Sequence, residues 1–170
     1  TAAGGKLVYA PVMLGERGET AVFKDPEGVL FGVVHSKNGD PLDYAGDLNE
    51  WYWIDLWTAD VEKAATFYRA AIGYETAPVA DDGPRSGVRL LSGGFARAGI
   101  MQKNSEKSSA TWLPYIRVAD AKAAAAAAKA AGGKVLLDPV AMNIATVAII
   151  ADPTGAPVGI VQLPVPDAQP

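Results

Sequence analysis

The sequence predicts an α+β fold in which one complete domain of two similar units follows the last part of a third unit. Two internal repeats predict this arrangement. Residues 51–73 match residues 111–133 at an offset of 60, and each half reads as a strand followed by a helix. Residues 2–34 match residues 130–161, and both contain the run Ala-Ala-Gly-Gly-Lys and an Asp-Pro-x-Gly turn. The segment at the start therefore matches only the later part of a unit.

Two helices are predicted, each preceded by an Asp and followed by a Gly. Asp60 and Asp120 suit the N-cap, because a carboxylate accepts hydrogen bonds from the free N–H groups of the first turn. Gly73 and Gly133 suit the helix ends, because glycine adopts the left-handed conformation that closes a helix. The first helix is expected over 61–72, where small and apolar residues share one stripe. The second contains six successive alanines, which favour a helix lying close to a sheet.

Apolar segments between turn signals predict the strands. Asp-Pro-x-Gly turns at 25–28 and 152–155 join pairs of strands, because this sequence suits a tight reversal. The predicted strands cover residues 6–12, 20–24, 29–35, 52–58, 88–91, 96–102, 112–118, 134–137, 146–151 and 157–163.

These units predict how the chain is divided. Residues 1–37 form the C-terminal part of a preceding domain, 38–50 a linker, 51–163 a complete two-unit domain and 164–170 an irregular tail. Thr1, in place of Met, lies where a helix would already be ending. We therefore expect a longer precursor with a full additional domain.

Composition excludes several classes of protein and site. The 170 residues include no Cys and one His, which excludes a disulfide scaffold, a thiolate zinc site, a cysteine nucleophile and a two-histidine metal site. Fifteen basic and 19 acidic residues give a net charge of −4, which disfavours nucleic acid and anionic membranes as partners. Because no apolar run is long enough for a membrane span and no signal peptide is evident, we expect a cytoplasmic protein.

Two motifs resemble the vicinal oxygen chelate superfamily, which contains glyoxalases, bleomycin-resistance proteins and extradiol dioxygenases. The first is Trp-Ile-Asp-Leu-Trp-Thr-Ala-Asp over residues 53–60, followed by Gly-Tyr at 73–74. The second runs from Gly-Gly-Lys-Val at 132–135 to Asp-Pro-x-Gly-Ala at 152–156. The nearest resemblance is to the two-domain glyoxalase-like branch. It implies paired βαβββ modules that form a half-open sheet around a cavity, preceded here by a partial module.

Metal-containing members of this family carry His, Gln or Glu at four inward positions, on the first and last strands of each module. The resemblance carries these positions onto Trp53, Gly99, Leu113 and Gly159, and onto Gly32 in the partial module. None of these side chains can ligate a hard divalent metal. We therefore expect no metal, no cofactor and no metal-polarised oxygen chemistry.

Strand alternation predicts which residues line the cavity instead, because side chains two residues apart share a face. Aromatic side chains, one carboxylate and two guanidiniums then face inward, which is typical of a small-molecule site. Gly99 and Gly159 leave room for a flat ligand. The predicted ligand-binding residues are Trp53, Asp55, Trp57, Arg97, Met101, Tyr115, Arg117 and Gly159.

Three functions remain open at this point. The first is a protein that binds a small hydrophobic or aromatic metabolite or antibiotic. The second is a metal-independent lyase, isomerase or hydroxylase with Asp55 as catalytic general acid or base, since a carboxylate between indoles suits proton transfer. The third is a metalloenzyme whose site lies in a missing domain.

Each predicted site residue also has a structural interpretation. The tryptophans can fill a closed core, and Asp55 can pair with Arg97 or Arg117 as a structural bridge. A half-open sheet leaves edges that need cover. Besides the small-molecule ligand, we therefore expect a missing N-terminal domain or a second chain as a partner.

Overall fold

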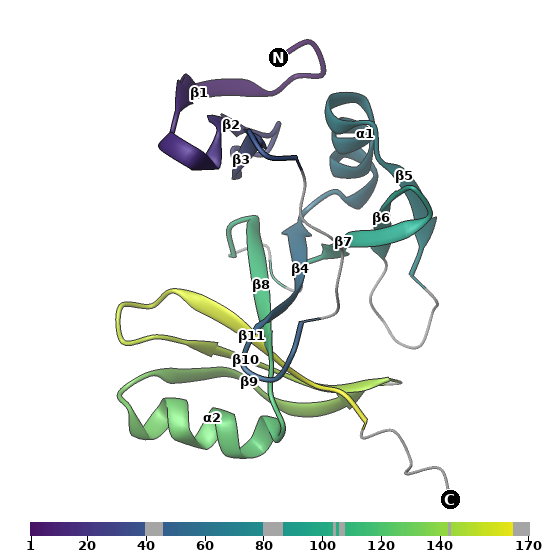
Figure 1. Cartoon of the computed structure of the whole chain (residues 1–170). Helices are drawn as coiled ribbons and strands as arrows, with labels where there is room; N and C mark the ends of the chain where they lie inside the picture. The colour runs from purple at the N-terminus through teal and green to yellow at the C-terminus, as the bar shows by residue number, and fades with distance from the viewer. Residues whose placement is uncertain (40–45, 80–86, 104, 106–107, 143, 165–170) are drawn as a thin grey trace, which may run out of the picture. The chain divides into compact units, whose positions relative to one another are not determined.

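The computed structural model describes residues 1–39, 46–79, 87–103, 105, 108–142 and 144–164. Within them the chain has the α+β composition that the sequence predicts (Figure 1). In chain order the elements are β1 (Lys6–Met13), the 3-10 turn η1 (Gly15–Arg17), β2 (Glu19–Lys24), β3 (Leu30–His35), β4 (Trp51–Thr58), α1 (Val61–Ile72), β5 (Glu75–Pro78), β6 (Gly87–Ser92), β7 (Phe95–Gln102), β8 (Thr111–Arg117), α2 (Ala121–Ala130), β9 (Lys134–Met142), β10 (Ala145–Ala151) and β11 (Pro157–Gln162).

The strands form two sheets. One has the order β1-β2-β3, and the other has the order β5-β6-β7-β4-β8-β11-β10-β9. In the larger sheet β4 runs parallel to β7, and β8 runs parallel to β11. The pairs β5–β6, β6–β7, β9–β10 and β10–β11 are antiparallel. Each half of the larger sheet therefore has βαβββ connectivity, and the predicted fold class is confirmed.

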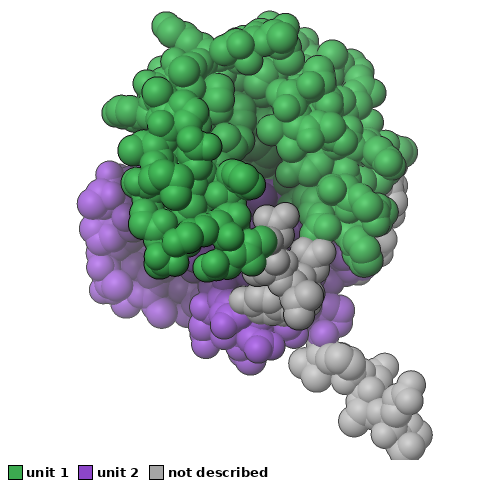
Figure 2. Space-filling model, turned by 45° about the horizontal axis from the view of Figure 1, so that its top comes forward, with its two compact units in different colours: residues 1–44, 55–112 green, residues 45–54, 113–170 purple. Residues whose placement is uncertain are grey.

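The chain divides into two compact units, which Figure 2 shows in different colours. Unit 1 comprises Thr1–Tyr44 and Asp55–Trp112, and unit 2 comprises Ala45–Ile54 and Leu113–Pro170. Strand β4 begins in unit 2 and ends in unit 1. The predicted domain boundaries at residues 37, 50 and 163 stay a prediction. Parts of the predicted linker and tail, residues 40–45 and 165–170, lie outside the described residues.

Both helices begin where the sequence predicts. The carboxylate of Asp60 accepts a hydrogen bond from the N–H of Lys63 at 3.0 Å, and so caps α1. The carboxylate of Asp120 accepts from the N–H groups of Lys122 and Ala123 at 2.8 and 2.9 Å. The predicted N-caps are therefore confirmed, and each satisfies amides that no helical carbonyl can reach.

The two helices end differently. Gly73 closes α1 in the left-handed conformation, with φ of 87°, as predicted. The prediction that Gly133 closes α2 is wrong. Helix α2 ends at Ala130, and Gly132 takes the left-handed conformation with φ of 88°. Gly133 is instead required by close packing, since a Cβ there would lie 2.6 Å from the carbonyl oxygen of Ala151.

In unit 1, α1 is covered on two sides. It contacts its own strands β5, β6 and β7. It also meets the smaller sheet, where the ring of Phe31 lies 5.9 Å from Phe67 and 5.5 Å from Tyr68. The single apolar stripe expected from the sequence does not account for both contacts, because the second surface comes from strands more than 30 residues away.

In unit 2, α2 packs on β9, β10 and β11. Ala121 of the helix and Ala148 and Ile160 of the sheet form one buried cluster where the two elements meet. The small side chains allow the close approach that the alanine run predicts.

Two strands depart from the prediction. Strand β9 continues through Pro139 to Met142, and its place at the edge of the sheet explains why a proline is tolerated there. Strand β5 was not predicted at all. Its four residues, Glu-Thr-Ala-Pro, are too few to show alternation.

Candidate functional site

Strand β4 presents the predicted aromatic face. Burial alternates over its last four residues: Leu56 and Thr58 are fully buried, whereas Asp55 and Trp57 are half-buried, as are Tyr52, Trp53 and Ile54 earlier in the strand. The two pairs occupy opposite faces of the strand, as the pleat requires. One face of β4 therefore belongs to the core, and the other carries two indoles with a carboxylate between them.

Strand β7 brings two predicted residues beside this face. In the parallel pairing, Asp55 lies opposite Gly99 and Trp57 lies opposite Met101. Neighbouring residues in register point to the same side of a sheet. Asp55, Trp57 and Met101 thus form one group in unit 1, and Gly99 contributes backbone only.

Arg97 lies nearer the start of β7. Its guanidinium carbon stands 5.7 Å from the ring centre of Phe95, and Nη2 donates to the carbonyl of Ser92 at 3.5 Å. Cation–π contacts of this kind are worth about 0.5–1 kcal/mol at exposed positions. These contacts hold the side chain toward the β6–β7 turn.

In unit 2 the equivalent pair is Tyr115 and Gly159, which lie opposite each other in β8 and β11. Tyr115 is 5% exposed. A Cβ built on Gly159 would collide with Cγ, Cδ1 and Cε1 of the Tyr115 ring. The ring therefore fills the space next to Gly159 that was expected to hold a flat ligand.

Arg117 ends β8 and contacts the segment that leads into β4. Its Nη1 donates to the carbonyl of Gly46 at 3.1 Å. The backbone N–H of Arg117 donates to the backbone carbonyl of Glu50 at 3.0 Å, and the backbone carbonyl of Arg117 accepts from the N–H of Asn49 at 2.7 Å. Asn49 has the unusual φ of 67°, so this clasp fixes a sharp turn directly before β4.

The predicted site residues are shared between the two units. Unit 1 brings together Asp55, Trp57 and Met101, with Arg97 nearer the start of β7, and unit 2 brings together Tyr115 and Gly159. Trp53 and Arg117 also belong to unit 2. A groove of about 520 Å³ lies elsewhere in unit 1 and involves none of these residues. Its lining consists of Ala2, Ala3, Gly4, Pro26, Glu62, Lys63, Thr66, Phe67 and Ala70.

The residues that the resemblance assigns to the family's metal positions lack ligating side chains. In unit 2, Leu113 is buried and apolar, and the Tyr115 ring packs on Gly159 where a ligating side chain would start. Among the described residues, no three His, Cys, Asp or Glu side chains are grouped closely enough to hold an ion. Hard divalent metals need such oxygen or imidazole ligands.

A buried polar contact in unit 1 could not be read from the sequence. The hydroxyl of Tyr68 donates to the Asp25 carboxylate at 3.3 Å, and the other carboxylate oxygen accepts from the N–H groups of Glu27 and Val29 at 2.9 Å. Burial, followed by the nearby Asp25 charge, raises the pKa of Tyr68 well above its usual range. The repeat shows a matching turn at Asp152, but the partner tyrosine comes from α1, far along the chain.

The matching turn at Asp152 is exposed. Its carboxylate accepts from the Thr154 hydroxyl at 2.7 Å and from the Ala156 N–H at 2.9 Å. These hydrogen bonds, the hydroxyl first, lower the pKa of the Asp152 carboxyl. The same sequence motif is thus a solvated turn in one module and a buried anchor in the other.

A second anchor joins the smaller sheet to the end of β4. The Glu27 carboxylate accepts hydrogen bonds from the hydroxyl of Thr58 and from the N–H of Ala59. Thr58 is fully buried. Together with the Asp25–Tyr68 contact, it ties the β2–β3 turn to the end of β4 and to the body of α1.

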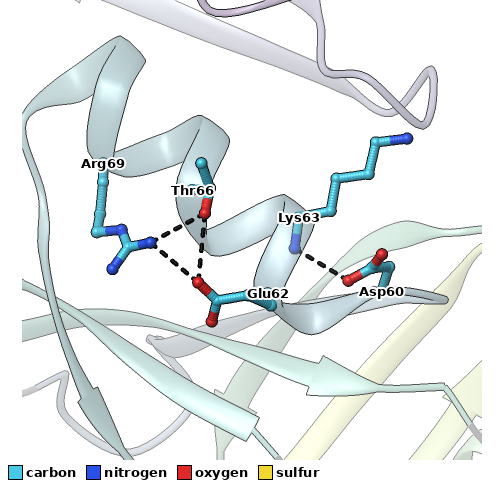
Figure 3. A network of polar contacts seen from close by, with 5 residues as sticks. All are labelled: Asp60, Glu62, Lys63, Thr66 and Arg69. Atoms are coloured by element: carbon cyan, nitrogen blue, oxygen red, sulfur yellow. Dashed lines mark hydrogen bonds and ion pairs between the residues drawn. The ribbon is translucent and has the colours of Figure 1, made fainter.

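A polar network lies on α1, and three of its residues, Glu62, Lys63 and Thr66, also line the groove. Arg69 donates to Glu62 at 3.0 Å and to Thr66 at 2.9 Å, while Asp60 caps the helix (Figure 3). Arg69 and Glu62 are exposed, and exposed pairs of this kind contribute about 0–1 kcal/mol. The network therefore adds little to stability.

Comparisons with known proteins agree with this fold. A family model described as a glyoxalase-like domain matches residues 51–161. The protein named "Putative glyoxylase CFP32" in Mycobacterium tuberculosis is 27% identical over 155 residues, which are 90% of this chain and 59% of that protein. "Anthracycline biosynthesis protein DauV" from Streptomyces sp. strain C5 is 28% identical over 172 residues, covering 95% of this chain and 58% of that protein. The chain therefore spans less than two thirds of the length of these relatives.

Among solved structures, the Mn(II)-bound glyoxalase of Novosphingobium aromaticivorans superposes with a TM-score of 0.61 at 19% identity. The match covers 95% of this chain and 55% of that one, and it shows the fold alone. In the described part of the chain, neither helix has the length and apolar character needed to cross a membrane.

Proposed function

Because the chain belongs to the glyoxalase-like family of the vicinal oxygen chelate superfamily, we propose that it binds a flat aromatic small molecule without a resident metal. The ligand carries a cationic or hydrogen-bond-donating group. The observation that carries this proposal is the burial at the end of β4, where Leu56 and Thr58 are fully buried while Asp55 and Trp57 stay half-buried on the other face, which Trp53 shares.

The chemistry of that face suits an aromatic ligand. Indole rings bury large flat areas and stack on other rings with about 0.5–1.5 kcal/mol beyond the area they bury. A carboxylate between them suits an amine or a hydroxyl donor, since hydrogen bonds to charged groups are stronger than neutral ones. Met101 in the neighbouring strand adds an adaptable thioether surface.

The absence of ligating side chains at the family's metal positions supports metal-independent binding. Tyr115 packs where a ligand from Gly159 would otherwise start, and Leu113 is a buried hydrocarbon. Neither residue can supply the oxygen or nitrogen atoms that a metal needs.

The relatives favour an aromatic natural product as the ligand. The Streptomyces relative is named an anthracycline biosynthesis protein, and anthracyclines are flat, fused-ring molecules. Several carry an amino sugar, which would place a cation beside Asp55. An anthracycline with its amino sugar and the corresponding aglycone therefore form a matched pair of probes.

The test is a titration of the purified chain with a panel of flat aromatic metabolites, including this pair, in buffer with a chelator. Saturable quenching of tryptophan fluorescence at one ligand per chain is expected, with the amine-bearing form bound more tightly. If no member of the panel gives saturable quenching, the proposal is wrong.

Two variants that each lose one aromatic ring, one on the proposed face and one in the smaller sheet, provide the control. Replacing Trp57→Leu removes an indole from the proposed face and is expected to weaken binding by about tenfold, the equivalent of ~1.4 kcal/mol. Tyr9→Leu removes an aromatic ring from β1 in the smaller sheet, where the side chain is 67% exposed, and should leave the affinity unchanged. Equal losses in both variants would refute the assignment of the site to this face.

Proton transfer by Asp55 is the second candidate function, and its place between the two indoles favours it. Asp55→Asn separates the two roles. If the carboxylate binds a cation, the variant loses its preference for the amine-bearing probe over the aglycone. If Asp55 is a catalytic acid or base, the variant keeps its affinity but loses turnover of the bound compound, measured by mass spectrometry.

A further inference from the structure

A second charged side chain stands in the same row of the larger sheet as Asp55. Arg89 in β6 lies opposite Gly99 in β7, and Gly99 lies opposite Asp55 in β4. Residues in register across neighbouring strands point to the same side of a sheet. Because Gly99 has no side chain, an arginine and an aspartate flank a bare position, with their backbones two strand spacings, or about 9–10 Å, apart. All three residues belong to unit 1.

The burial of the next row assigns this row to the open face of the sheet. The residues that directly follow the three in their strands are Leu56, Leu90 and Ile100, and all are fully buried. Successive side chains in a strand point to opposite faces, so Asp55 and Arg89 point away from the core. Arg89 is accordingly exposed and Asp55 is half-buried. Strand β6 is also an inner strand, with β5 and β7 on either side, so Arg89 does not protect a sheet edge.

The second module builds the equivalent row without charges. There Gly159 lies between Tyr115 and Ile149, and the Tyr115 ring packs on the glycine. Asp55 corresponds to Tyr115 at the repeat offset of 60, and Arg89 takes the place of Ile149. Both modules therefore keep a glycine in the centre of the row, but only the first flanks it with opposite charges. The fold itself does not require this charged pair.

Met101 supplies an apolar border to the same position. A Cβ on Gly87 would lie 2.5 Å from Sδ of Met101 and 3.1 Å from its Cε, so the Met101 side chain lies over Gly87. Gly87 stands two residues before Arg89 in β6 and shares its face. The thioether therefore lies next to Arg89, one row away from Gly99.

The guanidinium of Arg89 is available to a ligand. With the residues that the structure describes, Arg89 forms no hydrogen bond and no ion pair, whereas Arg69 on α1 is paired with Glu62. Even Glu75, which stands two residues before the β5 partner of Arg89, is not bonded to it. A guanidinium presents its N–H donors in a planar fork that matches the two oxygens of a carboxylate.

We propose that Arg89 binds an acidic oxygen of the aromatic ligand at the end opposite Asp55, with the ring lying over Gly99. The ligand then has a donor group at the Asp55 end and a carboxylate or acidic phenol at the Arg89 end. This inference rests on the ligand proposed above, and it adds a second polar group and the residue that selects it. The two charges fix which way round a flat ring lies, because stacking on an indole does not distinguish its two ends.

The probes are 6-amino-2-naphthoate and its neutral carboxamide, which differ only in the charge at one end. Each is titrated calorimetrically into the full 170-residue chain in buffer with a chelator. The carboxylate probe is expected to bind about tenfold more tightly than the carboxamide, because a hydrogen bond between two charged groups is stronger than one to a neutral group. This comparison needs no variant.

Three variants assign the preference to a residue. Arg89→Met removes the guanidinium and should lower the affinity for the carboxylate probe about tenfold, to that for the carboxamide, whose own affinity stays unchanged. Arg89→Lys keeps the charge without the planar fork and should retain part of the preference. Arg69→Met makes the same change of charge on α1, where Arg69 pairs with Glu62, and should leave both affinities unchanged.

Several results would overturn the inference and leave the proposed aromatic site in place. The parent chain could bind the two probes equally, or its preference for the carboxylate could survive in Arg89→Met. Loss of the preference in Arg69→Met as well would indicate attraction by the overall charge of the chain. The inference is also wrong if neither naphthalene binds while another member of the aromatic panel does. If no aromatic compound binds at all, the proposed function is wrong and the inference with it.

Discussion

The contact between Tyr115 and Gly159 leads to a specific prediction about stability. If the Tyr115 ring fills the space left by the missing side chain, Gly159→Ala must push the ring aside. Gly32→Ala makes the same change at the equivalent position of the smaller sheet, where that space is open. Neither glycine has a positive φ, so alanine fits the backbone at both positions.

The expected magnitudes follow from the two environments. A Cβ at residue 159 would lie 2.6 Å from Cγ of Tyr115, whereas carbon atoms in contact stand about 3.5–4.0 Å apart. Cδ1 and Cε1 of the ring are nearer still, so the ring must shift by more than about 1 Å in a buried setting, and overpacking of this kind costs about 1–3 kcal/mol. At residue 32 no such cost arises, and the loss of chain entropy in the unfolded state stabilises Gly32→Ala by about 0–1 kcal/mol.

Urea denaturation followed by circular dichroism measures both effects, with unchanged slopes as the check that each variant unfolds like the parent. A third measurement isolates the contact itself. In a Tyr115→Ala background, which costs about 3–5 kcal/mol alone, Gly159→Ala should add almost nothing. If Gly159→Ala is as stable as the parent, or if its cost survives in the Tyr115→Ala background, the ring does not fill that space and the reasoning is wrong.

Two further predictions concern unit 1. Tyr68→Phe removes the hydroxyl that donates to the buried Asp25 carboxylate and should lower the free energy of unfolding by about 1.5–3 kcal/mol in urea denaturation. The pKa of Tyr68 is raised in the folded protein. The contribution of its hydroxyl to the free energy of unfolding is therefore complete below the unfolded tyrosine pKa of about 10 and declines above that pH. The stability difference between parent and Tyr68→Phe should therefore narrow from pH 8 to about pH 11; a constant difference would contradict the linkage. Asp60→Ala removes the N-cap of α1 and should cost about 1 kcal/mol, whereas Asp60→Asn, which keeps an accepting oxygen, should cost much less; equal losses would show that capping is not the cause.

Local signals predicted most of the fold. Asp60, Gly73 and Asp120 mark helix boundaries because each residue satisfies a backbone requirement within one turn of itself. The parallel pairings β4–β7 and β8–β11 follow from the resemblance, which implies two βαβββ modules. The end of α2 was misplaced by one glycine because two adjacent glycines serve different purposes: Gly132 for its conformation and Gly133 for close packing.

The site was predicted less completely. Alternation placed Trp53, Asp55 and Trp57 on one face, and the burial of Leu56 on the other face agrees with it. Alternation predicts which face of a strand carries a side chain, but it does not predict which residues that side chain contacts. The contact of Arg117 with the Gly46 carbonyl depends on a turn that no periodic pattern describes.

The role of Asp25 depends on tertiary structure in the same way. Asp25 and Asp152 begin identical turns in the sequence. Only the packing of Tyr68 from α1 makes one of them a buried anchor. Long-range contacts of this kind separate two copies of a repeat whose local sequence signals are the same.

The central claim is that this glyoxalase-like chain binds an aromatic ligand without a metal, and calorimetric titration in the presence of a chelator tests it most directly. The chain, purified without added metal and dialysed against chelator, is titrated with the tightest-binding aromatic probe. The account predicts one-to-one binding that is unchanged when manganese, nickel, zinc or iron is restored. Binding that appears only after a metal is added, with about one ion retained per chain, would contradict it.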